Sequence, residues 1–400
     1  MARLAVTGLS ILFLNPSLSF ARNPHLERDL APEELKLLSS SSDRHDEKEK
    51  PTRFPQFNEG WPTSFKSLAK ELSPERDYVT WIIAEPESVM DLRSAENFRT
   101  SFMSSVTDSK LISHMMIAWS CHDEKGKRLV GGTALTGEDD EQTKKMIMDG
   151  WGMTPLYSVF TDGHLDTARG IGMMVTMTSK FKVPLAHVSF EVTREKCQNM
   201  LKFFKTFLTH PKKPYTRFGL NLDPMKFEGG GCGSFATALL SKAGVLTSVL
   251  PHFWRELRAS QYLMGLGLGY LPTNVELKLP REFGNRFNYV WLGDLQQLPW
   301  TANDGPLIRL VDPEMGILSL RQIALDYVHT SKSGVAALQK TGFALREVKG
   351  ASAAAIDERF DSRAARVVNS TRRELSLLRQ SGMNVAPVKL GSHWGLLIAR

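Results

Sequence analysis

The sequence predicts an α+β fold in which an antiparallel sheet packs against helices. Two segments with alternating apolar residues, 115–119 and 128–136, lie on either side of a polar turn and indicate a hairpin. A third alternating segment, 187–192, runs directly into residues whose apolar positions recur at helical spacing. A short helix preceded by glycines and a long C-terminal helix complete the pattern.

The overall composition is that of a globular chain. It has 400 residues, of which 42% are apolar and 23% charged, and this excludes collagen-like, low-complexity and wholly disordered proteins. The length allows two packed cores or one large one. The formal net charge of +7 is a mild bias over this length, so the sequence does not predict a nucleic-acid partner.

The N-terminal segment, 1–21, has the layout of a secretory signal peptide. Arg3 supplies positive charge, residues 4–14 form an apolar run, and Ser19 and Ala21 are the small residues of a cleavage site. The apolar run is about half the ~20 residues that a membrane anchor needs. We therefore expect cleavage near Ala21 and a periplasmic or secreted mature protein without a transmembrane segment.

Composition also divides the rest of the chain. Residues 22–60 hold a row of serines and dense mixed charge with few apolar side chains, which predicts a flexible leader. Globular composition starts at Trp61. We expect one domain over residues 61–250 and an accessory region over residues 251–400.

Two helices of the predicted domain have recognisable ends. Thr193 caps a helix whose apolar stripe lies within residues 197–208. A second, shorter helix spans about 234–243. Gly244 follows it at the position where helices commonly end with a residue in the left-handed conformation.

The long late helix, at about 352–380, is rich in arginine and is followed by an apolar terminal run, 393–399. Residues 346–400 hold ten basic and five acidic residues, so much of the positive charge is concentrated there. The arginines of the helix are Arg359, Arg363, Arg366, Arg372 and Arg373. This surface could dock an anionic envelope polymer, and the terminal run predicts a paired, buried strand.

Cys232 is the residue that most suggests chemistry. It lies at the first turn of a helix, after three consecutive glycines. A helix N-terminus favours a thiolate, and glycines let a substrate approach closely; the amides of Gly231 and Gly233 could hold an oxyanion. A cysteine nucleophile also needs a base, and His114 and His187 each open a predicted strand.

The third polar group of such a site would come from the strand beside His114. If the hairpin turns about residues 125–126, His114 faces positions near Gly137. Thr136 or Glu138 could then orient the imidazole, and the carboxylate of Glu138 has the right chemistry.

The order of these motifs resembles a known family. A strand opens with His114, V-S-F-E-V-T and then R-E-K follow at 188–196, and Y-T-R-F-G-L-N at 215–221 precedes G-C-G-S-F at 231–235. Over about residues 109–245 the chain resembles the circularly permuted branch of the papain-like NlpC/P60 superfamily, in which the histidine strand precedes the cysteine helix. That family often has Asn directly before the cysteine, where this sequence has glycine.

The resemblance implies a papain-like antiparallel sheet packed against the cysteine helix. It implies that Cys232 is the nucleophile and His114 the base. His187, which opens the other predicted strand, is the alternative base, and we expect no cofactor. The implied function is a secreted or periplasmic cysteine hydrolase. Such an amidase or peptidase would cleave a peptide or peptidoglycan-like substrate through a thioester.

Other interpretations stay open. The chain could be a non-catalytic cell-envelope binding or scaffold protein that keeps the fold without the chemistry. Ser67 and Lys70 form an S-x-x-K pattern, and K-T-G follows at 340–342, as in serine acyl-enzymes of the penicillin-binding type. No H-E-x-x-H pattern and no paired-cysteine spacing predicts a metal site.

The chain has three cysteines, so an oxidising compartment would leave at least one of them outside an internal disulfide. One arrangement is a bridge between Cys121 and Cys197 that leaves Cys232 as the thiol; another is three buried thiols. A bridge requires Cα atoms within about 7 Å.

Overall fold

The computed structural model describes residues 57–84, 114–137, 146, 149–180, 185–258, 260–265, 273–278, 290, 307–330 and 358–400. All of them belong to one compact unit that extends over residues 53–400. The predicted signal peptide and most of the predicted leader lie outside the described residues.

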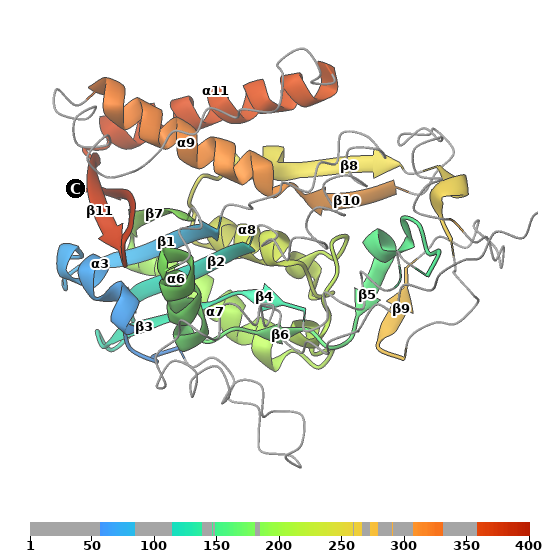
Figure 1. Cartoon of the computed structure of the whole chain (residues 1–400). Coiled ribbons are helices and arrows are strands. Elements are labelled where there is room, and N and C mark those ends of the chain that lie inside the picture. Colours follow the sequence, from blue (N-terminus) through green and yellow to red (C-terminus); the bar gives the residue numbers. More distant parts are fainter. Residues whose placement is uncertain are drawn as a thin grey trace, which may run out of the picture. The chain divides into compact units, whose positions relative to one another are not determined.

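A six-stranded mixed sheet forms the centre of the fold (Figure 1). Its strands lie in the order β11-β12-β7-β1-β2-β3, and all neighbours are antiparallel except β12 and β7. The strands are β1 (Asp77–Ala84), β2 (His114–His122), β3 (Arg128–Thr133), β7 (Leu185–Val192), β11 (Asn384–Leu390) and β12 (His393–Ala399). The predicted α+β class is confirmed.

Helices cover both faces of this sheet. The helices are α3 (Lys66–Glu71), α6 (Ala168–Lys180), α7 (Arg194–Thr209), α8 (Cys232–Lys242), α9 (Pro313–Thr330) and α11 (Glu358–Gln380). Met115, Ile117 and Trp119 of β2 join the core formed with α7, α8 and α9, whereas α6 packs on the opposite face at Ala118. Because helices lie on both sides, every residue of β1 and β2 is buried, as the apolar composition of these strands requires.

Strands β2 and β3 form the predicted hairpin. The side chain of Asp123 accepts two N–H groups of the turn, and Gly126 adopts a φ of +79°. The ladder ends at the pair Ile117–Thr133. Beyond it the chain leaves the sheet, and β4 (Leu135–Thr136) pairs with β6 (His164–Leu165).

Helices α7 and α8 follow the sequence prediction closely. The side chain of Thr193 accepts the N–H of Lys196 and caps α7. The two helices meet through aromatic rings, with Phe207 and Phe235 at 4.8 Å between centroids. After α8, Gly244 takes the left-handed conformation with a φ of +62°.

Smaller elements surround the central sheet. Two ribbons pair β8 (Trp254–Arg258) with β10 (Leu307–Val311) and β5 (Ser158–Phe160) with β9 (Val275–Leu277). The short 3-10 helices are η2 (Thr63–Phe65), η3 (Thr154–Tyr157), η4 (Pro214–Thr216), η5 (Pro224–Lys226), η6 (Leu250–Phe253) and η7 (Gln261–Leu263).

Residues on both sides of position 250 contribute to one hydrophobic core. Helix α11 packs on α9 and buries Val367 and Leu375. The β11–β12 hairpin extends the sheet beyond β7. The predicted buried strand at 393–399 is thereby confirmed, while residues 352–357 of the predicted late helix lie outside the described part of the chain.

The packing of β12 gives a direct test of this architecture. Leu396→Ala should lower the free energy of unfolding by about 3 kcal/mol, because Leu396 is 1% exposed between β7 and β11. Leu377→Ala is the matched control, since Leu377 is 53% exposed on α11 and should change stability little. Thermal or denaturant unfolding measures both, and equal melting of the two variants would contradict the docked strand.

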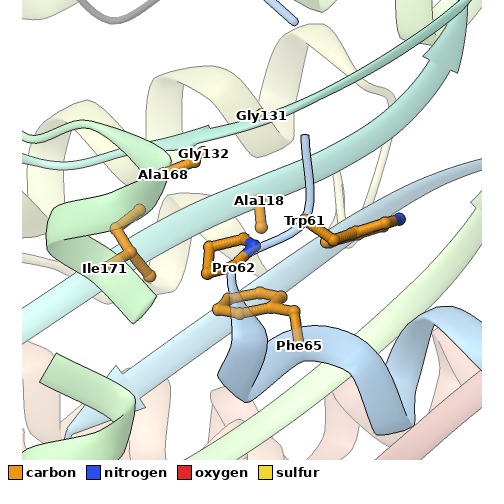
Figure 2. Close-up of a pocket in the computed structure, with 8 residues that line it drawn as sticks. All are labelled: Trp61, Pro62, Phe65, Ala118, Gly131, Gly132, Ala168 and Ile171. Carbon is orange, nitrogen blue, oxygen red and sulfur yellow. The ribbon is translucent and has the colours of Figure 1, made fainter. Parts of the chain in front are cut away.

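A small apolar pocket lies on the α6 side of the sheet (Figure 2). Trp61, Pro62 and Phe65 face Ala118 of β2 and Ile171 of α6 there. No charged side chain lines it. We interpret it as a packing gap between η2 and α6.

Within the described residues, no helix combines the length and apolar character that crossing a membrane requires.

Candidate active site

Cys232 is the first residue of α8, as the sequence predicted. Gly231 precedes it with an extended backbone, and the N–H of Gly231 donates to the hydroxyl of Ser234 at 3.0 Å. This bond fixes the first turn. The thiol is partly exposed at the helix N-terminus.

The glycines before Cys232 allow a close crossing of the chain. Gly229 has a φ of +116°, and a Cβ atom there would lie 2.3 Å from the carbonyl oxygen of Arg217. A Cβ atom on Gly230 would lie 2.8 Å from the ring of Pro224. Side chains at these positions would force the preceding loop away from the N-terminus of α8.

His114 opens β2 and meets the thiol. Its side chain is 11% exposed, and it interacts with Cys232 both by charge and by a side-chain hydrogen bond. The backbone N–H groups of Met115 and Gly233 also hydrogen-bond to the sulfur of Cys232. The strand end and the helix start thus hold the two groups together.

Asp166 is a third member of this cluster, and the sequence prediction missed it. Its Oδ2 lies 3.8 Å from Nε2 of His114 and accepts the hydroxyl of Thr136 at 2.9 Å. Its backbone N–H donates to the carbonyl oxygen of Ala134 at 2.8 Å. Because Asp166 directly follows β6, the β4–β6 pairing brings it to His114.

A second imidazole lies on the other side of the same carboxylate. Nε2 of His164 is 3.8 Å from Oδ1 of Asp166. Asp166 also lies two residues before α6, where the positive end of the helix favours a negative charge. Two histidines, a hydroxyl and a helix end therefore all favour the ionised carboxylate.

Charge interactions in the cluster outweigh burial. Burial raises the pKa of the Cys232 thiol, but the His114 imidazolium and the hydrogen bonds lower it, and the net pKa lies below the ordinary 9.0. Burial lowers the pKa of His114, yet Cys232 and Asp166 raise it to about 10. Burial raises the pKa of Asp166, but His114 holds it below the ordinary 3.8. These directions favour a thiolate–imidazolium pair at neutral pH.

The alternative residues from the sequence lie elsewhere or outside the described residues. His187 lies in β7 opposite Ile82 and packs against Gly395 of β12, away from the thiol cluster. Burial lowers the pKa of His187 to about 3. Glu138 falls outside the residues that the structure describes. Thr136 is near, but it contacts Asp166.

The predicted oxyanion donors differ in what they do. The N–H of Gly231 is used by Ser234, whereas the N–H of Gly233 points to the sulfur of Cys232. The first-turn N–H groups of a helix lack intrahelical acceptors, so the amide of Cys232 itself joins the candidates. Sequence spacing alone does not distinguish these amides.

The contacts of Ser67 and Lys70 do not support the alternative serine acyl-enzyme site. The hydroxyl of Ser67 donates to the carbonyl oxygen of Lys389 at 3.1 Å, and Lys70 is exposed at the end of α3. The K-T-G motif at 340–342 lies outside the described residues.

Cys121 and Cys197 form a disulfide, with Cα atoms 5.8 Å apart. It joins the end of β2 to the first turn of α7. Of the two arrangements that the sequence left open, the structure contains the one with Cys232 as the remaining thiol. Beside the bridge, Nδ1 of His122 lies 2.5 Å from the buried carboxylate of Asp77.

Among the described residues, no group of His, Cys, Asp or Glu side chains is arranged to hold a metal ion. Comparison of the chain with protein-family models, with curated proteins and with solved structures finds no significant match.

Proposed function

We propose that the protein is a cysteine hydrolase that cleaves amide bonds through a thioester. The observation that carries the proposal is the contact of Cys232 with His114, backed by Asp166, at the N-terminus of α8. A nucleophile, a base and a group that orients the base are the parts such a reaction needs. The thiol is also partly exposed, as attack on a substrate requires.

The proposed reaction uses each group in turn. The thiolate of Cys232 attacks the amide carbonyl carbon, and first-turn N–H groups of α8 stabilise the negative oxygen. The imidazolium of His114 gives its proton to the leaving amine, and a thioester remains. His114 then takes a proton from water, the hydroxide attacks the thioester, and the acid leaves as the thiolate is restored. Asp166 keeps the imidazole oriented and stabilises its charged form.

The proposed substrate is a peptide or a peptidoglycan-like amide, which is the class implied by the motif order around His114 and Cys232. The proposed location is periplasmic or secreted, with cleavage of the signal peptide near Ala21. The Cys121–Cys197 disulfide supports an oxidising compartment, where such bonds persist. An anionic envelope polymer is the proposed partner of the arginine-rich α11.

Alkylation of the thiol tests the proposal. Iodoacetamide should modify Cys232 at pH 6.5 at least about tenfold faster than N-acetylcysteine, because the lowered pKa of Cys232 leaves a larger fraction of it ionised than of an ordinary thiol. Mass spectrometry of unreduced protein locates the label, and Cys232→Ser should abolish it. If the rate matches that of N-acetylcysteine, the non-catalytic binding or scaffold role becomes the better reading.

A further inference from the structure

A second cluster of charged groups lies where α11 crosses η6 and the β8–β10 ribbon. Its centre is the ion pair of Arg255 and Asp312, which are 6% and 4% exposed. Nε and Nη2 of Arg255 lie 2.9 and 2.5 Å from Oδ2 of Asp312. Oδ1 of Asp312 accepts the N–H of Glu314 at the start of α9, so the carboxylate is already occupied.

Helix α11 adds Arg363 to this buried pair. Arg363 is four residues before the buried Val367, so both lie on the side of the helix that faces the core. The Arg363 side chain is only partly exposed and lies near Arg255 and Asp312. The described residues offer Arg363 no hydrogen bond or ion pair, because Asp312 is used by Arg255.

Among the side chains that the structure describes, positive groups outnumber negative ones in this cluster. The guanidinium groups are those of Arg255, Arg309, Arg363 and Arg366. The carboxylates are those of Asp312 and Glu256, and Glu256 lies 3.8 Å from Arg309. Burial, Arg366 and Arg363 lower the pKa of His252 on η6, which keeps that imidazole neutral at pH 7.

A half-buried cation with cationic neighbours and no acceptor is unfavourable until an anion joins it. Guanidinium groups bind carboxylate and phosphate oxygens in pairs. We propose that the surface between η6 and α11 binds a doubly charged oxyanion, held by Arg363 and Arg366. This site is separate from the thiol chemistry, so it holds whether or not the protein is a hydrolase.

Thermal unfolding in different salts tests the site. Inorganic phosphate should raise the melting temperature of the wild-type protein by about 2–4 °C over chloride at the same ionic strength. Arg363→Gln should remove this difference, and Arg366→Gln should reduce it. Succinate in place of phosphate tells whether the site takes carboxylates as well as phosphates, and stabilisation by either one supports the proposal.

Arg372→Gln is the matched control, because Arg372 is exposed on α11 nine residues from Arg363 and so on the opposite side of the helix. It makes the same change in charge and should keep the phosphate effect. In chloride, Arg363→Gln should melt at or above the wild-type temperature, because it removes a partly buried cation that makes no hydrogen bond or ion pair with the described residues. The proposal is overturned if neither phosphate nor succinate stabilises the wild type, or if the anion that does so stabilises Arg363→Gln equally.

Discussion

Replacing His114 with alanine should slow alkylation of Cys232 at pH 6.5 by roughly 10- to 100-fold. In the wild type the imidazolium of His114 lowers the pKa of the thiol against the effect of burial. Without it, burial remains and the thiol pKa should rise to the ordinary value or above it. The greater nucleophilicity of a high-pKa thiolate offsets part of the loss, which limits the expected factor.

The dependence of the alkylation rate on pH follows from the two pKa shifts. The pKa of Cys232 is lowered and that of His114 is raised to about 10, so the ion pair exists between these two values. It is lost in acid, when the thiolate is protonated, and above about pH 10, when the imidazolium loses its proton. Wild-type alkylation should therefore level off at a lower pH than alkylation of His114→Ala, which should keep rising up to pH 9 or beyond.

His210→Ala is the control for this experiment, because His210 ends α7 and stacks on Phe227 away from the thiol. It should keep the wild-type profile. Asp166→Asn should give an intermediate shift, since the amide can still contact His114 but carries no charge. If His114→Ala melts at the wild-type temperature and its alkylation rate depends on pH as in the wild type, His114 does not activate the thiol.

Removing the disulfide should have the largest effect on stability. The double variant Cys121→Ser, Cys197→Ser should lose about 4 kcal/mol, because the bridge closes a long loop with a sequence separation of 76. The melting temperature should fall by about 6 °C. Differential scanning calorimetry of the wild type with and without reductant provides the same comparison without mutation.

Cys232→Ser is the control for the disulfide experiment, because it removes a sulfur atom that takes no part in the bridge. It should melt within a degree or two of the wild type. If the double variant also melts at the wild-type temperature, the disulfide contributes nothing to stability, and β2 and α7 are held together by packing alone.

Local patterns were enough to predict several parts of the fold. Thr193 marks the start of α7, the glycines mark the start of α8, and the polar turn around Gly126 marks the β2–β3 hairpin. Each depends on neighbours within a few residues. Strand β12 was predictable for a different reason, since an apolar run of strand type is stable in water only when it is buried or paired.

The parts that the sequence prediction missed depend on distant pairing. Asp166 reaches His114 only because β4 leaves the β2–β3 ladder at Thr133 and pairs with a two-residue strand about 30 residues later. No spacing rule predicts such a short strand. The prediction of Glu138 assumed instead that the ladder continues. In the same way, β11 and β12 join a sheet whose other strands end at residue 192.

The position of β12 in the sheet determines how long the edge of β7 stays unpaired during synthesis. Strand β7 exposes one edge until β12 pairs with it, and β12 follows β7 by about 200 residues along the chain. Open strand edges recruit other strands, so a chain still being synthesised carries an unprotected sheet edge until β12 has been made. Pairing of β12 with β7 is therefore the step that removes this aggregation hazard.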